Sequence, residues 1–173
     1  MMNLQKIYRS LLIETVVREK LNKIVKDLLG KHVGGRPFFD ALDDAIKDVV
    51  NEDIIIEIMG GMENQWIATS GGFGDRLYDM WESGKIKCRG MVVFNGKMCT
   101  NKIGVTCWYP EDFDLNNKSF VFVDDSLFSG GTVKKIDDFL ISNHNSSIEN
   151  VSVVYDGSPN RNPLVKSLFR YYQ

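Results

Sequence analysis

The stretch FVFV at 120–123 runs directly into two aspartates, a glycine-rich loop and an apolar-periodic segment. Four consecutive apolar residues without polar alternation are typical of a strand that is buried on both faces, as strands of a parallel sheet are. The segment VKKIDDFLI at 133–141 has the apolar spacing of an amphipathic helix. The sequence therefore predicts a strand, a tight loop and a helix here, which is the repeating unit of an α/β fold.

Strand and helix patterns alternate through the chain from residue 53 onward. A strand, a glycine turn and a helix are expected within 65–81, and further strands at 54–58, 87–94 and 151–156, with a β-rich run at 103–109. This alternation predicts an α/β fold with a mostly parallel sheet flanked by helices, that is, a Rossmann-like core.

The first 52 residues have a different pattern, with apolar residues spaced three and four apart. A long amphipathic helix is expected over 3–29, with Gly30 as its stop, and a second helix from Pro37 to about Val50. No linker is long enough to divide the chain. We therefore expect a single domain over 1–173, in which 1–52 form an N-terminal helical cap or hood on a core at 53–173.

Composition excludes several classes of function. The chain has 173 residues, of which 43% are hydrophobic and 25% charged, with a formal net charge of −2, as in an ordinary soluble protein. It has no dense Lys/Arg block, so a nucleic-acid partner is not expected. No apolar run approaches the roughly 20 residues of a membrane span, and the charged N-terminal segment does not resemble a signal peptide.

The cysteines point to a reducing compartment. Cys88, Cys99 and Cys107 are odd in number and lack CxxC spacing, so free thiols and a cytoplasmic location are expected. The two histidines, His32 and His144, lie far from them in sequence, so a zinc site is not expected.

The residues after FVFV have a composition suited to a phosphorylated ligand. In open α/β sheets, ligands bind beyond the carboxyl ends of strands, where Asp124 and Asp125 are expected. A loop at 129–132 that enters a helix offers backbone N–H groups to an anion, and Gly130 and Gly131 allow close approach. The aspartates would accept hydrogen bonds from hydroxyls or bind a metal. A ribose 5-phosphate meets both requirements. The alternative is a solvated strand end followed by a helix cap and a turn.

FVFVDDSLFSGGT resembles the phosphoribosyl pyrophosphate (PRPP) motif of type I phosphoribosyltransferases, and twelve of its thirteen positions fit. The resemblance implies that Asp124 and Asp125 bind the ribose hydroxyls and, through them, Mg²⁺. It also implies that the loop from Ser129 to Thr132 cradles the 5-phosphate. The PRPP-binding residues so implied are Asp124, Asp125, Ser126, Leu127, Phe128, Ser129, Gly130, Gly131 and Thr132.

Two further segments resemble the family more loosely. ATSGGFGDRL at 68–77 resembles its pyrophosphate loop, here Ser70, Gly71 and Gly72, although Ser70 stands where the family often has an arginine. The alternative is a strand-to-helix turn with glycines for tight packing. Residues 87–107 occupy the place of the family's mobile hairpin, which makes Lys97 and Lys102 candidates to meet the pyrophosphate. Either lysine is equally well explained as a solvated surface charge.

Together these matches imply a Mg²⁺-dependent phosphoribosyltransferase of nucleotide metabolism. It would transfer 5-phosphoribosyl from PRPP to a nitrogenous base that the sequence does not identify, with release of pyrophosphate. The catalytic residues would be Asp124, Asp125, Lys97 and Lys102, and the family implies a homodimer. Two alternatives remain: a catalytically inactive module that binds PRPP or a nucleotide in a regulatory role, and a protein that keeps only the fold.

Phe128 is the one position that does not fit the motif. Enzymes of this family that act on 6-oxopurines often have an aspartate there, placed to exchange a proton with the base, and a phenylalanine cannot transfer a proton. General acid–base help typically contributes about 10²–10⁴-fold to a rate. We therefore expect that the protein is not a hypoxanthine or guanine phosphoribosyltransferase. Phe128 either offers an apolar face to the acceptor or packs beneath the loop.

Overall fold

The computed structural model describes residues 4, 15–16, 18–24, 26–27, 35–99, 106–159 and 162–170. The chain divides into two compact units, residues 1–57 and residues 58–173. The described residues within 3–29 are helical, as predicted, while the rest of that helix and its expected stop at Gly30 lie outside the described residues. A single domain over 1–173, with 1–52 as a cap, stays a prediction.

The first unit contains one predicted helix and one that the sequence pattern misassigned. Helix α2 (Gly35–Val49) confirms the second predicted helix. Residues 54–58, predicted as a strand, instead belong to helix α3 (Glu52–Ile58). The reason is a helix-start signal, because the Asn51 side-chain oxygen accepts the Ile54 N–H at 3.0 Å and two acids fill the first turn. This cap outweighs the strand preference of three isoleucines.

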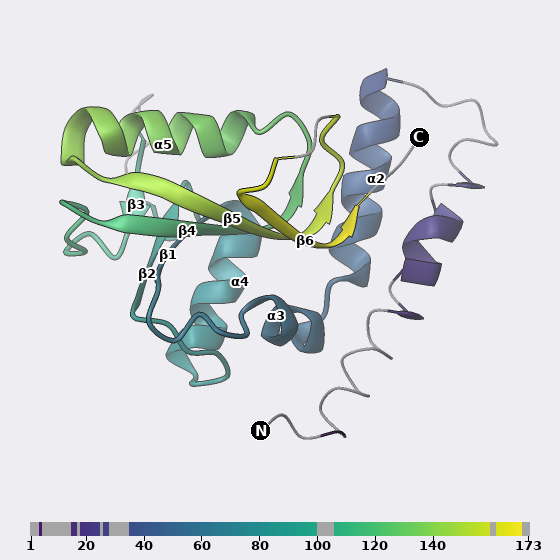
Figure 1. The fold of residues 1–173 in the computed structure, drawn as a ribbon, viewed down its shortest axis with the longest axis horizontal. Helices are drawn as coiled ribbons and strands as arrows, with labels where there is room; N and C mark the ends of the chain where they lie inside the picture. The colour runs from purple at the N-terminus through teal and green to yellow at the C-terminus, as the bar shows by residue number, and fades with distance from the viewer. Residues whose placement is uncertain are drawn as a thin grey trace. The chain divides into compact units, whose positions relative to one another are not determined.

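The second unit contains a mostly parallel sheet, which confirms the predicted fold class. Its strands, among the described residues, are β1 (Trp66–Ser70), β2 (Gly90–Phe94), β3 (Trp108–Tyr109), β4 (Ser119–Leu127), β5 (Ser147–Asp156) and β6 (Val165–Arg170). Their order is β3-β2-β1-β4-β5-β6, and only the β2–β3 pair is antiparallel. Helix α4 (Gly71–Glu82) follows β1 and helix α5 (Gly131–His144) follows β4 (Figure 1).

The strand predictions differ from the structure mainly in their bounds. β4 continues through the two aspartates to Leu127, and β5 begins four residues before the predicted run at 151–156. Of the β-rich run at 103–109, residues 103–105 lie outside the described residues and Trp108–Tyr109 form β3. β6 was not predicted. Its six residues, VKSLFR, show no regular alternation of apolar and polar side chains, so the strand signal is weak.

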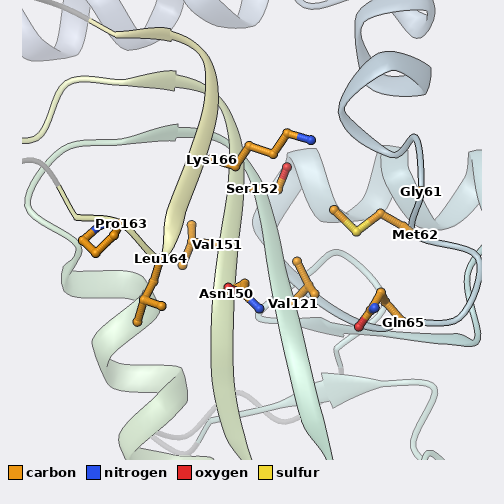
Figure 2. Close-up of a pocket in the computed structure, with 10 residues that line it drawn as sticks. All are labelled: Gly61, Met62, Gln65, Val121, Asn150, Val151, Ser152, Pro163, Leu164 and Lys166. Atoms are coloured by element: carbon orange, nitrogen blue, oxygen red, sulfur yellow. The ribbon is translucent and has the colours of Figure 1, made fainter.

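A cavity of about 250 Å³ lies near the starts of the parallel strands. Gln65 precedes β1, Val121 is the third residue of β4 and Lys166 the second of β6, and all three line it (Figure 2). Ser152 also lines this cavity, and its hydroxyl donates a long 3.5 Å hydrogen bond to the Ile58 carbonyl. The predicted PRPP residues lie at the other end of β4 and in the loop after it, and none of them lines the cavity.

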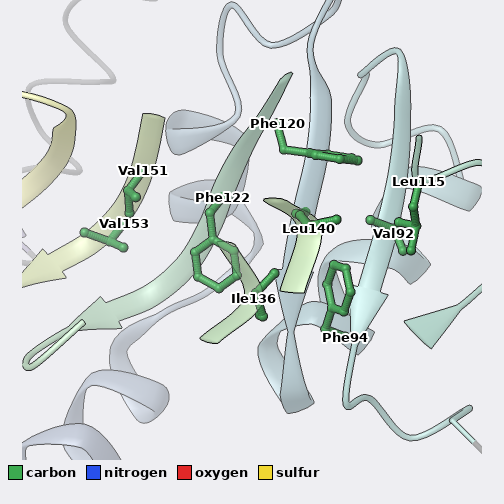
Figure 3. Close-up of a cluster of buried hydrophobic side chains, with 10 residues drawn as sticks. Val92, Phe94, Leu115, Phe120, Phe122, Ile136, Leu140, Val151 and Val153 are labelled. Atoms are coloured by element: carbon green, nitrogen blue, oxygen red, sulfur yellow. The ribbon is translucent and has the colours of Figure 1, made fainter. Parts of the chain in front are cut away.

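The two faces of the sheet are covered by different helices (Figure 1). On one face, Ile136 and Leu140 of α5 pack against Phe120 and Phe122 of β4 in the buried cluster that Figure 3 shows. On the other face, Gly74 of α4 lies so close to Thr69 and Val93 that an added Cβ would come within 3.0 Å of both side chains. The helices therefore hold β1, β2 and β4 from both sides, as the uninterrupted apolar run predicted.

No helix among the described residues is long and apolar enough to cross a membrane. Cys88, Cys99 and Cys107 are free thiols, which agrees with the expectation from their number and spacing.

Candidate functional site

The candidate site lies at the carboxyl ends of β1 and β4, where successive strands of the chain are added on opposite sides of β1. From β1 the chain adds β2 on one side and later β4 on the other, so the loops after β1 and β4 leave the carboxyl edge in opposite directions. Such a topological switch point leaves a crevice in which open α/β sheets bind ligands. The loop after β1 is the Ser70–Gly72 segment and the loop after β4 is the Ser129–Thr132 segment. The structure thus places both predicted loops at one edge.

Asp124 and Asp125 are the sixth and seventh residues of β4. Because successive side chains in a strand alternate between faces, Asp124 lies on the α5 face with Phe122, and Asp125 lies on the α4 face with Val123. The Asp125 side chain is 7% exposed, whereas Asp124 is half-buried. The alternation separates two like charges that the sequence places side by side.

The predicted phosphate loop is largely exposed, and it enters α5 through a glycine. Gly130 has φ 75°, in the left-handed region that favours glycine, and it caps the N-terminus of α5. The Gly131 N–H donates to the Ser129 hydroxyl at 3.3 Å, and Ser129, Gly131 and Thr132 are exposed. The first N–H groups of a helix have no partner within the helix, and the start of α5 is exposed, so an anion would have access to this end of the helix.

The second loop is built in a similar way at the end of β1. Ser70 ends the strand, and Gly71 begins α4 with φ 62°. A Cβ at Gly71 or Gly72 would meet nothing within 4 Å, so these glycines are not required by packing. This result disfavours the tight-packing alternative at these two positions, although Gly74 further along α4 does pack tightly.

Lys97 lies in the turn at 95–99 that directly follows β2, the Lys97 turn, and its side chain is exposed. The turn leaves β2 beside the start of α4, because β1 and β2 are paired with Ser70 opposite Phe94. Lys97 is thus brought to the same edge as the two loops. Lys102 lies outside the described residues.

Phe128 packs beside β5. Its ring centroid lies 6.2 Å from that of Tyr155, and an added Cβ at Gly157 would come within 2.7 Å of the Phe128 ring. The side chain is nevertheless only half-buried. One side of the ring packs against the protein, and some of its surface stays accessible.

Sequence analysis missed two groups of polar residues at this edge. Asp75 of α4 contacts the Lys97 turn and Tyr109 of β3. Asp156, 3% exposed, ends β5, where its carboxylate accepts the Ser158 N–H at 2.9 Å and lies 3.8 Å from the Arg170 Nε. Asp156 follows an apolar run as Asp124 does, which was the available signal for it. Nothing in the sequence indicates the contacts of Asp75.

No cluster of three or more side chains suited to a metal ion occurs in the described part of the chain. Asp124 and Asp125 carry the carboxylate oxygens that Mg²⁺ prefers, but their side chains lie on opposite faces of β4. A Mg²⁺ ion at this strand end would therefore take at most one of the two acids as a ligand, and a phosphorylated substrate and water would supply the others.

Comparison with solved structures finds similar folds among phosphoribosyltransferases. Adenine phosphoribosyltransferase from Thermoanaerobacter pseudethanolicus is 14% identical, with a TM-score of 0.45 over 75% of this chain and 82% of that one. Hypoxanthine phosphoribosyltransferase from Staphylococcus aureus is 14% identical, with a TM-score of 0.44 over 70% and 76%. That of Trypanosoma cruzi is 11% identical, with a TM-score of 0.38 over 92% and 73%.

No family model matches the chain, and no curated protein does. These structures share 11–14% of their residues with this chain, at TM-scores of 0.38–0.45.

Proposed function

We propose that this protein is a Mg²⁺-dependent phosphoribosyltransferase that transfers the 5-phosphoribosyl group of PRPP to a nitrogenous base. One observation supports this most. The thirteen-residue motif lies at the switch point of the sheet, with its acids in β4 and its glycine loop at the start of α5. The alternative, a strand end followed by a helix cap and a turn, gives no reason for the acids, the left-handed Gly130 and the Ser70–Gly72 loop to lie at the same carboxyl edge of the sheet.

In the proposed reaction a nitrogen of the acceptor attacks C1 of PRPP. The bond between C1 and the pyrophosphate oxygen breaks, and pyrophosphate leaves with the electron pair. Mg²⁺, when bound, would neutralise charge on the pyrophosphate. The task of the protein is positioning: the Ser129–Thr132 loop would bind the 5-phosphate, and Asp124 and Asp125 would orient the ribose hydroxyls.

Phe128 stands at the position where the family often has an acid that exchanges a proton with the acceptor, and a phenylalanine cannot do so. The acceptor is therefore proposed to arrive as an anion or to lose its proton to a group outside this loop. Phe128 is held against Tyr155 and Gly157 and keeps part of its surface accessible, which suits a stacking contact with a flat base. The homodimer and the cytoplasmic location remain predictions.

The test is pyrophosphate release from PRPP and Mg²⁺ with a panel of purines, pyrimidines, orotate and nicotinate. We expect release with at least one acceptor and none without PRPP. If the protein binds PRPP but releases pyrophosphate with no acceptor, the binding module replaces the enzyme. Ser70 in place of the arginine is the observation that favours this second candidate, because it leaves the leaving group with one cation fewer.

A further inference from the structure

The Asp75 carboxylate joins three elements at the candidate site. Asp75 is the fifth residue of α4, which begins with Gly71 and Gly72. Its two carboxylate oxygens each accept the backbone N–H of Lys97 at 3.0 Å, and one of them also accepts the Tyr109 hydroxyl of β3. These partners lie 22 and 34 residues away in sequence. The contact therefore fixes the Lys97 turn to the helix that carries the second predicted loop.

The turn approaches Asp75 more closely than any side chain at position 96 would allow. An added Cβ at Gly96 would lie 2.5 Å from an Asp75 carboxylate oxygen and 2.6 Å from the Tyr109 ring. The turn begins at Asn95, which has φ 53°, and its N–H donates to the Cys107 carbonyl at 2.9 Å. The Cys99 N–H closes the turn on the Gly96 carbonyl at 3.1 Å. A defined backbone therefore presents Lys97.

Tyr109 remains a hydrogen-bond donor to this carboxylate. Burial raises the pKa of Tyr109, and the hydrogen bond to Asp75 and the negative charge of Asp75 raise it further. The phenol thus keeps its proton through the whole physiological range. Its hydrogen bond to Asp75 holds β3 to the same point as the Lys97 turn.

The position of Lys97 matters because the loop at 70–72 lacks its expected cation. Ser70 carries no charge, and Asp75, which is negative, lies one helical turn beyond Gly71. Its carboxylate is already engaged by the Lys97 N–H and the Tyr109 hydroxyl, and the flexible Lys97 side chain is exposed beside it. A pyrophosphate at the Ser70–Gly72 loop would lie within the reach of this ammonium group.

We propose that Asp75 is a positioning residue, which holds the Lys97 turn against α4 so that the Lys97 ammonium and the Ser70–Gly72 loop bind one pyrophosphate group. Lys97 thereby supplies the positive charge that an arginine at position 70 would carry and that Ser70 lacks. This inference rests on the proposed function, because it concerns the leaving group of PRPP.

A double-mutant cycle on PRPP affinity, measured by calorimetry with Mg²⁺, tests the inference. Lys97→Ala should weaken PRPP binding by about 10–100-fold, as expected for a hydrogen bond to a charged group. Asp75→Ala should weaken it to a similar extent in the wild-type background, and by less than about 3-fold when Lys97 is already alanine. Lys97→Arg should retain most of the affinity, and Asp79→Asn, an exposed acid one turn further along α4, serves as the matched control.

If Asp75→Ala does not fold, Asp75→Asn replaces it in the cycle, because asparagine keeps the size of the side chain but removes the charge and one acceptor. The contact between residue 75 and Tyr109 is measured without PRPP, by the absorbance of tyrosinate during an alkaline titration. Asp75→Asn should let one tyrosine ionise at lower pH than in the wild type, and the Tyr109→Phe variant identifies that tyrosine.

The outcomes separate the two claims. If the Asp75 and Lys97 effects on PRPP affinity add in full while wild-type binding is intact, Asp75 has no role through Lys97 and only this inference fails. If the wild type binds no PRPP, the proposed function fails together with the role of Asp75. An unchanged tyrosine titration in Asp75→Asn overturns the contact itself, whatever PRPP does.

Discussion

The carboxylate of Asp124 accepts the backbone N–H of Asp125 at 2.8 Å. These neighbours in β4 point to opposite faces of the sheet, which is how the chain accommodates two adjacent acids in a mostly buried strand. They differ in environment, because Asp125 is almost fully buried on the α4 face while Asp124 is half-buried on the α5 face. A ligand at the end of β4 would thus meet one acid on each side of the strand.

Asp125→Asn should abolish or greatly slow pyrophosphate release. Loss of a charged hydrogen-bond acceptor for the ribose hydroxyls should weaken PRPP binding by about 10–100-fold. The matched control is Asp138→Asn on α5, whose exposed carboxylate pairs only with Lys134 in the described structure, at 2.9 Å. Unchanged turnover in Asp125→Asn would remove the role assigned to this residue.

Gly130→Ala should damage the phosphate loop more than Gly131→Ala. Alanine at Gly130 must adopt φ 75°, which costs about 1–2 kcal/mol for a residue with a Cβ. Gly131 lies in the helix, and a Cβ there would meet only the Ser129 hydroxyl at 3.4 Å. Urea unfolding and PRPP calorimetry on both variants measure the difference, and equal behaviour of the two would contradict the loop geometry.

The nature of residue 128 limits the acceptors that the protein can use. The wild-type protein should not convert hypoxanthine or guanine efficiently, because Phe128 has no proton-transferring group. Efficient conversion of either base by the wild-type protein would contradict this prediction.

Phe128 should also contribute to stability. Phe128→Ala should lower the free energy of unfolding by about 2–3 kcal/mol. This loss is somewhat less than the roughly 3–5 kcal/mol typical of a fully buried phenylalanine, because the ring is half-buried against Tyr155. If acceptor affinity stays intact in Phe128→Ala, its role is packing and not stacking.

Stability should fall as the pH rises above about 9. Burial raises the pKa of the Cys88 thiol from 9.0 to about 11, and it raises the pKa of Tyr109 as well. Between pH 9 and pH 11 the unfolded chain releases a Cys88 proton that the folded chain retains, so the unfolded state binds fewer protons and folding becomes less favourable with rising pH. Urea unfolding at pH 7.5, 9 and 10.5 should show this decline, with a shallower slope in Cys88→Ser. A flat profile would mean that burial does not perturb these groups.

The sequence was most informative where local pattern and chemistry coincide. The run FVFV predicts a strand, the glycines at 130–131 predict a loop, and the apolar spacing of α5 predicts a helix. All three are present. The run at 54–58, predicted as a strand, is helical because the Asn51 cap outweighs the strand preference of its isoleucines. The assigned roles of Asp124, Asp125 and the loop residues in PRPP binding stay predictions, as does that of Lys102.

The contacts of Asp75 were beyond prediction for a different reason. They join residues that are distant in sequence, and they depend on the pairing of β1 with β2 and on the path of the following turn. Neither an aspartate in a helix nor a glycine after Asn95 signals such a contact by its own pattern. Periodicity describes which face of an element is buried, and it does not say which side chains meet across elements.

The carboxyl end of β4 and the start of α5 are proposed to bind the 5-phosphoribosyl group. A two-dimensional amide NMR titration of the isotope-labelled chain with PRPP and Mg²⁺ tests this proposal residue by residue. The largest shifts are expected at Gly130, Gly131 and Thr132, with further shifts at Gly71 and Gly72. Shifts confined to the cavity lined by Ser152 and Lys166, or no shifts at millimolar PRPP, would contradict it.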